Sequence, residues 1–146
     1  MVHALEEVRR VLIPGGILLD IRPLTDHWRI EVVSARGVKE TGRVEDLPAQ
    51  VNADAASNSA MMEVEARGWF KREREEFFPF FYSWDTPSEM EETIKEEWED
   101  SVGVLTQEAK QATRTTWALS DADSRIRVDV KILISKWRKT SDAVEP

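Results

Sequence analysis

The residues that could bind a small molecule lie in two short stretches of the chain. The first follows a short apolar run and contains Arg22, Asp26, His27 and Trp28. If that run is a strand of an open α/β sheet, these side chains lie at its carboxyl end, where ligands gather in such sheets. The alternative is a polar loop in which Trp28 packs against its neighbours and contacts no ligand, and we favour this alternative over a substrate site.

The second stretch is the aromatic run from Phe77 to Trp84, which includes Tyr82. Aromatic side chains supply a large contact area at low entropic cost, so the run could form the wall of an apolar substrate pocket. Packing in the core is the more common role of such a run. The candidate substrate-binding residues are therefore Arg22, His27, Trp28 and Tyr82.

No catalytic or metal-binding pattern accompanies these candidates. The two histidines, His3 and His27, are far apart, and no H-x-x-x-H or H-x-E spacing exists, which argues against a metal site. The carboxylates of the segment Glu89 to Asp100 are spread around a predicted helix as on a water-facing surface. Neither a G-x-S-x-G elbow nor a P-loop occurs. The catalytic residues stay unknown.

Composition favours one domain and excludes some partners. The chain has 146 residues, of which 41% are hydrophobic, and a net charge of -8. An acidic surface repels phosphate backbones, and the basic residues between Lys71 and Glu76 are offset by acids, so nucleic acid is not expected as a partner. The chain contains no cysteine, and it begins in a charged amphipathic segment without an apolar signal region. We expect a cytoplasmic protein without a membrane span.

The first elements form an α/β unit. Leu5, Val8, Val11 and Leu12 recur at helical spacing, which predicts a helix over residues 2–12. Pro14, Gly15 and Gly16 break that helix and turn the chain. The run from Ile17 to Ile21 is apolar at nearly every position, so we predict a strand buried on both faces and ended by Pro23.

The later elements are predicted from alternation and capping. Apolar and polar residues alternate over 28–33 and 38–44, which predicts the two strands of a hairpin. A further strand, with a bulge or an edge at Pro79, is predicted over 69–84, and the alternation over 125–137 predicts a long strand. Thr86, Pro87 and Glu89 predict a helix start, and another helix begins near Thr106. We expect one domain over residues 1–139 and a disordered tail over 140–146. A further helix is predicted to start near Asp46 or Pro48, with Val51, Ala55, Met61, Met62 and Val64 on its buried side. The helix that starts at Thr86 should bury Met90, Ile94 and Trp98. The helix that starts near Thr106 should bury Leu105, Ala109, Ala112 and Trp117.

The segment from Ala4 to Leu19 resembles the one that leads into the fifth strand of the sheet in class I S-adenosylmethionine-dependent methyltransferases. In that family a helix with an E-x-x-R-V-L pattern ends in P-G-G. Here the helix carries Glu7, Arg10, Val11 and Leu12 at those positions, followed by the Pro-Gly-Gly turn. The match is dense up to Pro23, and the remainder agrees only in its order of elements.

The resemblance implies an α/β fold with part of a Rossmann-like methyltransferase sheet. In that sheet an antiparallel seventh strand would lie between the fifth and the sixth. Residues 17–21 would be the fifth strand, the strand ending near Trp84 the sixth, and residues 125–137 the seventh. The chain would then be the C-terminal, substrate-side half of a small-molecule methyltransferase. A non-catalytic remnant that dimerises or binds a ligand or a protein is the alternative.

The resemblance also bears on the cofactor and on partners. In the family the cofactor is held by a glycine-rich loop after the first strand, and no G-x-G-x-x-G pattern occurs in this chain. We therefore expect no cofactor on this chain alone, and S-adenosylmethionine only if the missing half is supplied. The strand at 17–21 would lack its neighbour, and an open apolar edge invites pairing. We expect a homodimer or a complementary chain there.

Overall fold

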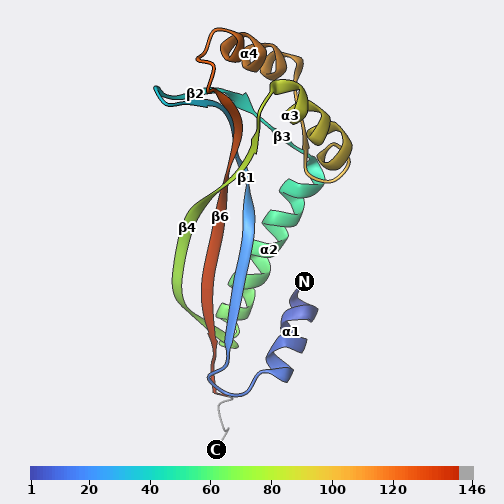
Figure 1. Cartoon of the computed structure of the whole chain (residues 1–146). Coiled ribbons are helices and arrows are strands. Elements are labelled where there is room, and N and C mark those ends of the chain that lie inside the picture. The colour runs from blue at the N-terminus through green and yellow to red at the C-terminus, as the bar shows by residue number, and fades with distance from the viewer. Residues whose placement is uncertain (142–146) are drawn as a thin grey trace, which may run out of the picture. The chain divides into compact units, whose positions relative to one another are not determined.

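Helices and long strands alternate along residues 1–141, which a computed structural model describes (Figure 1). The helices are α1 (Val2–Val11), α2 (Pro48–Ala66), α3 (Pro87–Thr93), the π-helical segment η1 (Ile94–Trp98) and α4 (Gln107–Ala118). The strands are β1 (Ile17–Ser34), β2 (Gly37–Arg43), β3 (Glu45–Asp46), β4 (Phe70–Trp84), β5 (Gly103–Val104) and β6 (Arg125–Lys139). The predicted disordered tail falls mostly on residues 142–146, which lie outside the described residues.

The four longer strands form one sheet in the order β2-β1-β6-β4, and β3 pairs with β5 in a second sheet. The predicted hairpin is confirmed, because β1 and β2 pair antiparallel from Arg29 opposite Arg43 to Ser34 opposite Gly37. The fold is α/β, as expected.

The last strand, β6, runs against both of its neighbours. The Lys139 N–H donates to the Gly16 carbonyl oxygen (2.8 Å) beside the start of β1. The Thr140 N–H donates to the Trp69 carbonyl oxygen (3.1 Å) beside the start of β4. Since the end of β6 lies beside the beginnings of β1 and β4, the sheet is antiparallel, and β1 and β4 point the same way on either side of β6.

The Pro-Gly-Gly turn joins α1 to β1 in a way that needs both glycines. Gly15 has a φ of +75°, a conformation that side chains with a Cβ rarely adopt. At Gly16 a Cβ atom would lie 2.8 Å from the Ile13 carbonyl oxygen, so no larger residue fits there. The predicted helix end and turn are confirmed.

The chain divides into two compact units, and β1, β4 and β6 supply residues to each. The first unit comprises residues 1–23, 52–78 and 132–146. Its core forms where α1 and α2 pack on the strands (Figure 1), and Leu12, Leu18 and Trp69 flank it. The buried members of this core are Leu5, Ala60, Met61, Val64, Phe70 and Trp137.

The second unit comprises residues 24–51 and 79–131. Its helix α3 begins with the predicted capping box, in which the Thr86 hydroxyl accepts from the Glu89 N–H (3.3 Å) and the Glu89 carboxylate accepts from the Thr86 N–H (3.3 Å). Met90, Ile94 and Trp98 are buried, as predicted. The helix thus presents one apolar face to the strands of its unit.

The strand predicted over 17–21 exists, but two predictions about it were wrong. It is not buried on both faces, because Ile17, Leu19 and Ile21 are 46%, 54% and 56% exposed while the residues between them are half-buried. It also continues through Pro23, whose missing N–H is tolerated where a strand does not need that donor. An apolar run alone could not tell a strand covered on two faces from one covered on a single face.

Other buried positions also differ from the predictions. On α2, Met61 and Val64 are buried, but Val51 and Met62 are exposed and the unpredicted Ala60 is buried. On α4, Ala109 is buried as predicted, and so is Thr113, which was not predicted. Ala112 and Trp117 were predicted to be buried but are half-buried. Among the described residues, no helix is long and apolar enough to cross a membrane.

Candidate functional site

A cavity of about 430 Å³ lies in the first unit between α2 and the strands β1, β4 and β6. Its volume falls in the range of roughly 300–1,000 Å³ that is typical of small-molecule sites. The residues that line it are Asp20, Arg22, Asn58, Met61, Met62, Glu65, Arg72, Glu75, Leu133, Ser135 and Trp137. We call this space the α2 cavity.

The floor of the α2 cavity is apolar. Trp137 is only 4% exposed, and its indole N–H donates to the Ser135 hydroxyl (2.8 Å). The Arg72 guanidinium carbon lies 5.7 Å from the centre of the Trp137 ring, within the range of a cation–π contact. Leu133 and Met61 are buried beside it. The alternation along β6 places Leu133, Ser135 and Trp137 on one face of the sheet, toward α2.

Arg22 holds one side of the cavity together. Its Nε donates to both carboxylate oxygens of Asp20 (3.2 Å each), its Nη1 donates to the Asp54 carboxylate (2.9 Å), and its Nη2 donates to the Asn58 side-chain oxygen (2.6 Å). The side chain is 15% exposed. All three guanidinium nitrogens are therefore engaged within the protein, and Arg22 links β1 to α2.

The charges around the cavity are unequal. The lining contains three carboxylates, on Asp20, Glu65 and Glu75, and two guanidinium groups, on Arg22 and Arg72. Arg22 is paired with Asp20, and Arg72 is paired with Glu75 (3.0 Å). Within the described residues, the Glu65 side chain has no hydrogen-bonding or ionic partner. The wall of the cavity consequently carries an unbalanced negative charge.

The predicted substrate-binding residues are divided between the two units. Arg22 lines the α2 cavity, while His27, Trp28 and Tyr82 belong to the second unit. Trp28 is 7% exposed, and its ring lies edge-on to Trp98 with centroids 5.3 Å apart. Tyr82 stacks on Trp28 at 6.3 Å, so these two rings pack together. His27 is exposed, and a substrate role for these residues stays a prediction.

The aromatic run does not pack throughout as a core segment. Phe77, Phe78, Phe80 and Phe81 are each between 41% and 50% exposed. Arg127 places its guanidinium carbon 4.2 Å from the centre of the Phe81 ring. The prediction of core packing is thus wrong for these four side chains, whereas Trp84, at the end of β4, is half-buried and its ring contacts that of Trp98.

Most residues of the α2 cavity were not predicted from the sequence. Met61 was predicted to be buried but not to bind, and Glu65, Arg72 and Trp137 were not singled out. A faint signal was present, since the side of α2 that lines the cavity combines methionines with Asn58 and Glu65, an unusual mixture for a helix that only packs. The partner strands of that helix, however, come from distant parts of the sequence.

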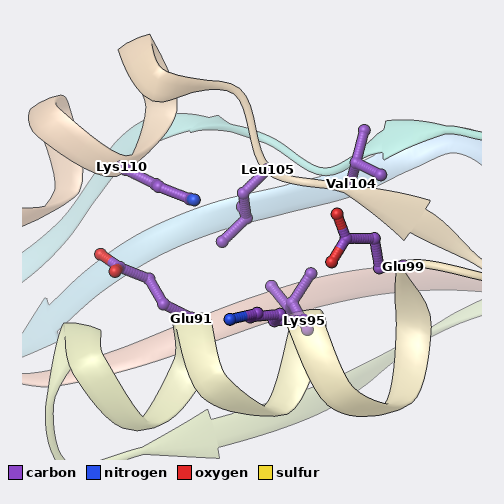
Figure 2. Close-up of a pocket in the computed structure, with 7 residues that line it drawn as sticks. Glu91, Lys95, Glu99, Val104, Leu105 and Lys110 are labelled. Atoms are coloured by element: carbon purple, nitrogen blue, oxygen red, sulfur yellow. The ribbon is translucent and has the colours of Figure 1, made fainter.

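A smaller cavity of about 210 Å³ lies in the second unit between η1, α3 and the start of α4. Figure 2 shows Lys95 and Lys110 on its rim, with Leu105 between the elements that carry them. Glu91, on the same rim, accepts from Arg114 (2.7 Å), and this hydrogen bond raises the pKa of that guanidinium above its ordinary value. This volume is below the usual range for an organic ligand.

The described residues show no metal site, and the comparisons with known proteins give no match. Within residues 1–141, no group of three or more His, Cys, Asp or Glu side chains is placed to hold a metal ion. No family model matches the chain, and no curated protein or solved structure matches it either.

Proposed function

We propose that this chain is the substrate-side half of a methyltransferase-like sheet, and that the site for S-adenosylmethionine lies outside residues 1–146, on a further segment or a partner chain that pairs with β1. The observation that carries the proposal is the strand order. β6 is last in the sequence, yet it lies between β1 and β4 and runs against both. The resemblance implies this order for the fifth, seventh and sixth strands of the family's sheet.

The start of the chain supports the same assignment. A helix ends at Leu12, a Pro-Gly-Gly turn follows, and a strand begins at Ile17, in the order that the resemblance implies. The Lys139 ammonium donates to the carbonyl oxygens of Arg9 and Leu12 (2.8 Å each) at the end of α1. A cation at the C-terminal end of a helix is favoured by the helix dipole, so this contact holds α1 beside the sheet.

The first segment of β1 has an open edge, where another strand can be added. β2 pairs with β1 only from Arg29 onward, and within the described residues no other strand follows on that side. Because Gly16 faces β6, the alternation of an antiparallel ladder directs the N–H groups of Ile17, Leu19 and Ile21 to the open edge. Such an edge pairs readily with another chain.

A non-catalytic module that associates through this edge is the second candidate function. The exposed side chains of Ile17, Leu19 and Ile21 favour it, because an apolar exposed strand suits association whether or not chemistry takes place. Reading the coding sequence upstream of Met1 in the same frame can favour the enzyme over the association module. A strand followed by a glycine-rich loop there supports the enzyme and assigns the cofactor site to the same reading frame.

Light scattering during size-exclusion chromatography tests the open edge. We expect a mass above 16.8 kDa that increases with protein concentration. The variant Leu19→Pro removes an N–H from the edge and should shift the mass toward that of one chain, whereas Leu19→Thr keeps the N–H and serves as the matched control. A single-chain mass for the unmodified protein at every concentration contradicts the pairing.

Calorimetry with S-adenosylmethionine tests the division of roles. We expect the isolated chain to show no binding tighter than about 100 μM, or about 5.5 kcal/mol. Tighter binding would mean that residues 1–146 themselves hold the cofactor, and the assignment of that site to a region outside them would then be wrong.

A further inference from the structure

We infer that the α2 cavity binds a small arylalkylamine, an organic cation with an aromatic body. This inference goes beyond the proposed function, because it concerns binding by the isolated chain and needs neither a second polypeptide nor the cofactor. It rests on three features of the cavity, namely its apolar floor, its unpartnered carboxylate and the engagement of all three guanidinium nitrogens of Arg22.

The floor suits an aromatic or apolar body. The Trp137 indole N–H is already bonded to Ser135, so the ring offers only its carbon surface to a ligand. Leu133 and Met61 extend that surface. Met62, which is 70% exposed at the cavity mouth, has an unbranched, polarisable side chain that can fold over a ligand and lose its own contact with water.

The polar rim suits a cation. Glu65 lines the cavity and has no partner among the described residues, so an ammonium group can pair with it without displacing another contact. Glu75 adds negative charge to the same rim, although Arg72 already pairs with it (3.0 Å). A positive ligand charge therefore meets a wall whose net charge is negative.

An anionic ligand would meet the opposite situation. Arg22 is engaged through all three nitrogens by Asp20, Asp54 and Asn58, and Arg72 is paired through Nη1 with Glu75. A carboxylate or phosphate would have to break the contacts of Arg22 and leave the half-buried Asp20 without its cation, or share Arg72 with Glu75 beside the negative charge of Glu65. The cavity thus discriminates between amine and acid of the same shape.

The test uses a series of ligands that share one aromatic body. 2-Phenylethylamine, 2-phenylethanol and 3-phenylpropionate are titrated separately into the ¹⁵N-labelled full chain, and the indole N–H signal of Trp137 is followed by NMR. The variant Trp137→Phe assigns that signal by its loss. We expect the amine to shift it saturably at concentrations up to about 10 mM, the alcohol to bind more weakly, and the acid to leave it in place.

Two variants on one helix identify the carboxylate. Glu65→Gln should weaken amine binding roughly two- to fivefold, the scale of an exposed ion pair, and leave binding of the alcohol unchanged. Glu63→Gln is the matched control, because Glu63 is on α2 but pairs with Arg67 and does not line the cavity. Both positions are exposed or half-exposed on the helix, so both variants should fold.

The outcomes that overturn the inference are specific. In the ligand series, the inference is wrong if the acid binds as tightly as the amine, if the amine shifts other signals but not that of Trp137, or if no ligand gives a saturable shift. It is also wrong if Glu65→Gln and Glu63→Gln lose affinity for the amine equally. None of these results bears on whether β1 pairs with another chain, so failure here is distinguishable from failure of the proposed function.

Discussion

Glu73 shows how single residues fasten the strands of the first unit. Its carboxylate accepts from Arg138 Nη2 (3.1 Å) and lies 3.0 Å from Lys136 Nζ, so β4 is tied to β6 across the ladder. The hydrogen bond from Arg138, followed by that from Lys136, lowers the pKa of Glu73 from its ordinary value of 4.5 to about 2. Glu73 thus makes cross-strand ion pairs with two residues of β6.

The lowered pKa predicts a dependence of stability on pH. A carboxyl group with a lower pKa in the folded state stabilises the fold above its unfolded pKa and loses that contribution as the pH falls through its folded pKa. For Glu73 the loss lies between about pH 4.5 and about pH 2. Urea unfolding across this window should show a shallower decline for Glu73→Gln than for the unmodified protein. Glu96→Gln, an exposed residue without a partner in the described chain, should retain the original decline.

Arg22 is predicted to contribute to stability more than to binding. Replacement by methionine removes its contacts with Asp20, Asp54 and Asn58 and leaves the half-buried Asp20 carboxylate without its cation. We expect the free energy of unfolding to fall by about 2 kcal/mol. Arg22→Lys should recover only part of this, because an ammonium cannot span the three partners as a planar guanidinium does.

Urea denaturation measures both variants, with Arg10→Met as the control. Arg10 pairs with Glu7 on the exposed face of α1, and its side chain is 69% exposed, so its loss should change stability by less than about 0.5 kcal/mol. An Arg22→Met protein as stable as the unmodified chain would contradict the structural role of this residue.

At the scale of elements, the start of α3 is held by its capping box. Thr86→Ala removes the hydroxyl that accepts from the Glu89 N–H and should lower the free energy of unfolding by about 1 kcal/mol. Thr86→Ser keeps the acceptor and should restore most of the loss. Ser88→Ala, at an exposed position of the first turn, is the control and should be close to neutral. Thermal or urea unfolding followed by circular dichroism compares the three.

At the scale of the whole molecule, the open edge of β1 predicts a pattern of hydrogen exchange. The amides of Ile17, Leu19 and Ile21 should exchange faster than those of Leu18 and Asp20 in dilute protein, because the first set is directed away from β6. As the concentration increases, pairing with a second chain should slow the exchange of the first set only. Amide exchange read by NMR at two concentrations measures this, and equal rates for both sets when dilute would show that the edge is already covered.

Local patterns determined most of the elements. The spacing of Leu5 and Val8 predicted α1, the capping box at Thr86 predicted the start of α3, and strict alternation predicted β6. These predictions were possible because each signal is carried by residues within a few positions of one another. The hairpin of β1 and β2 was likewise predicted, since its two strands are adjacent in sequence.

Only the tertiary structure decided which faces of these elements are covered. Ile17 to Ile21 has the same composition whether one or two layers pack on it, so the sequence could not show that Leu19 is exposed. The α2 cavity joins residues from β1, α2, β4 and β6, and Arg22 meets Asn58 36 positions away. Such a site depends on the order of strands in the sheet, which follows from packing between distant segments rather than from any local preference.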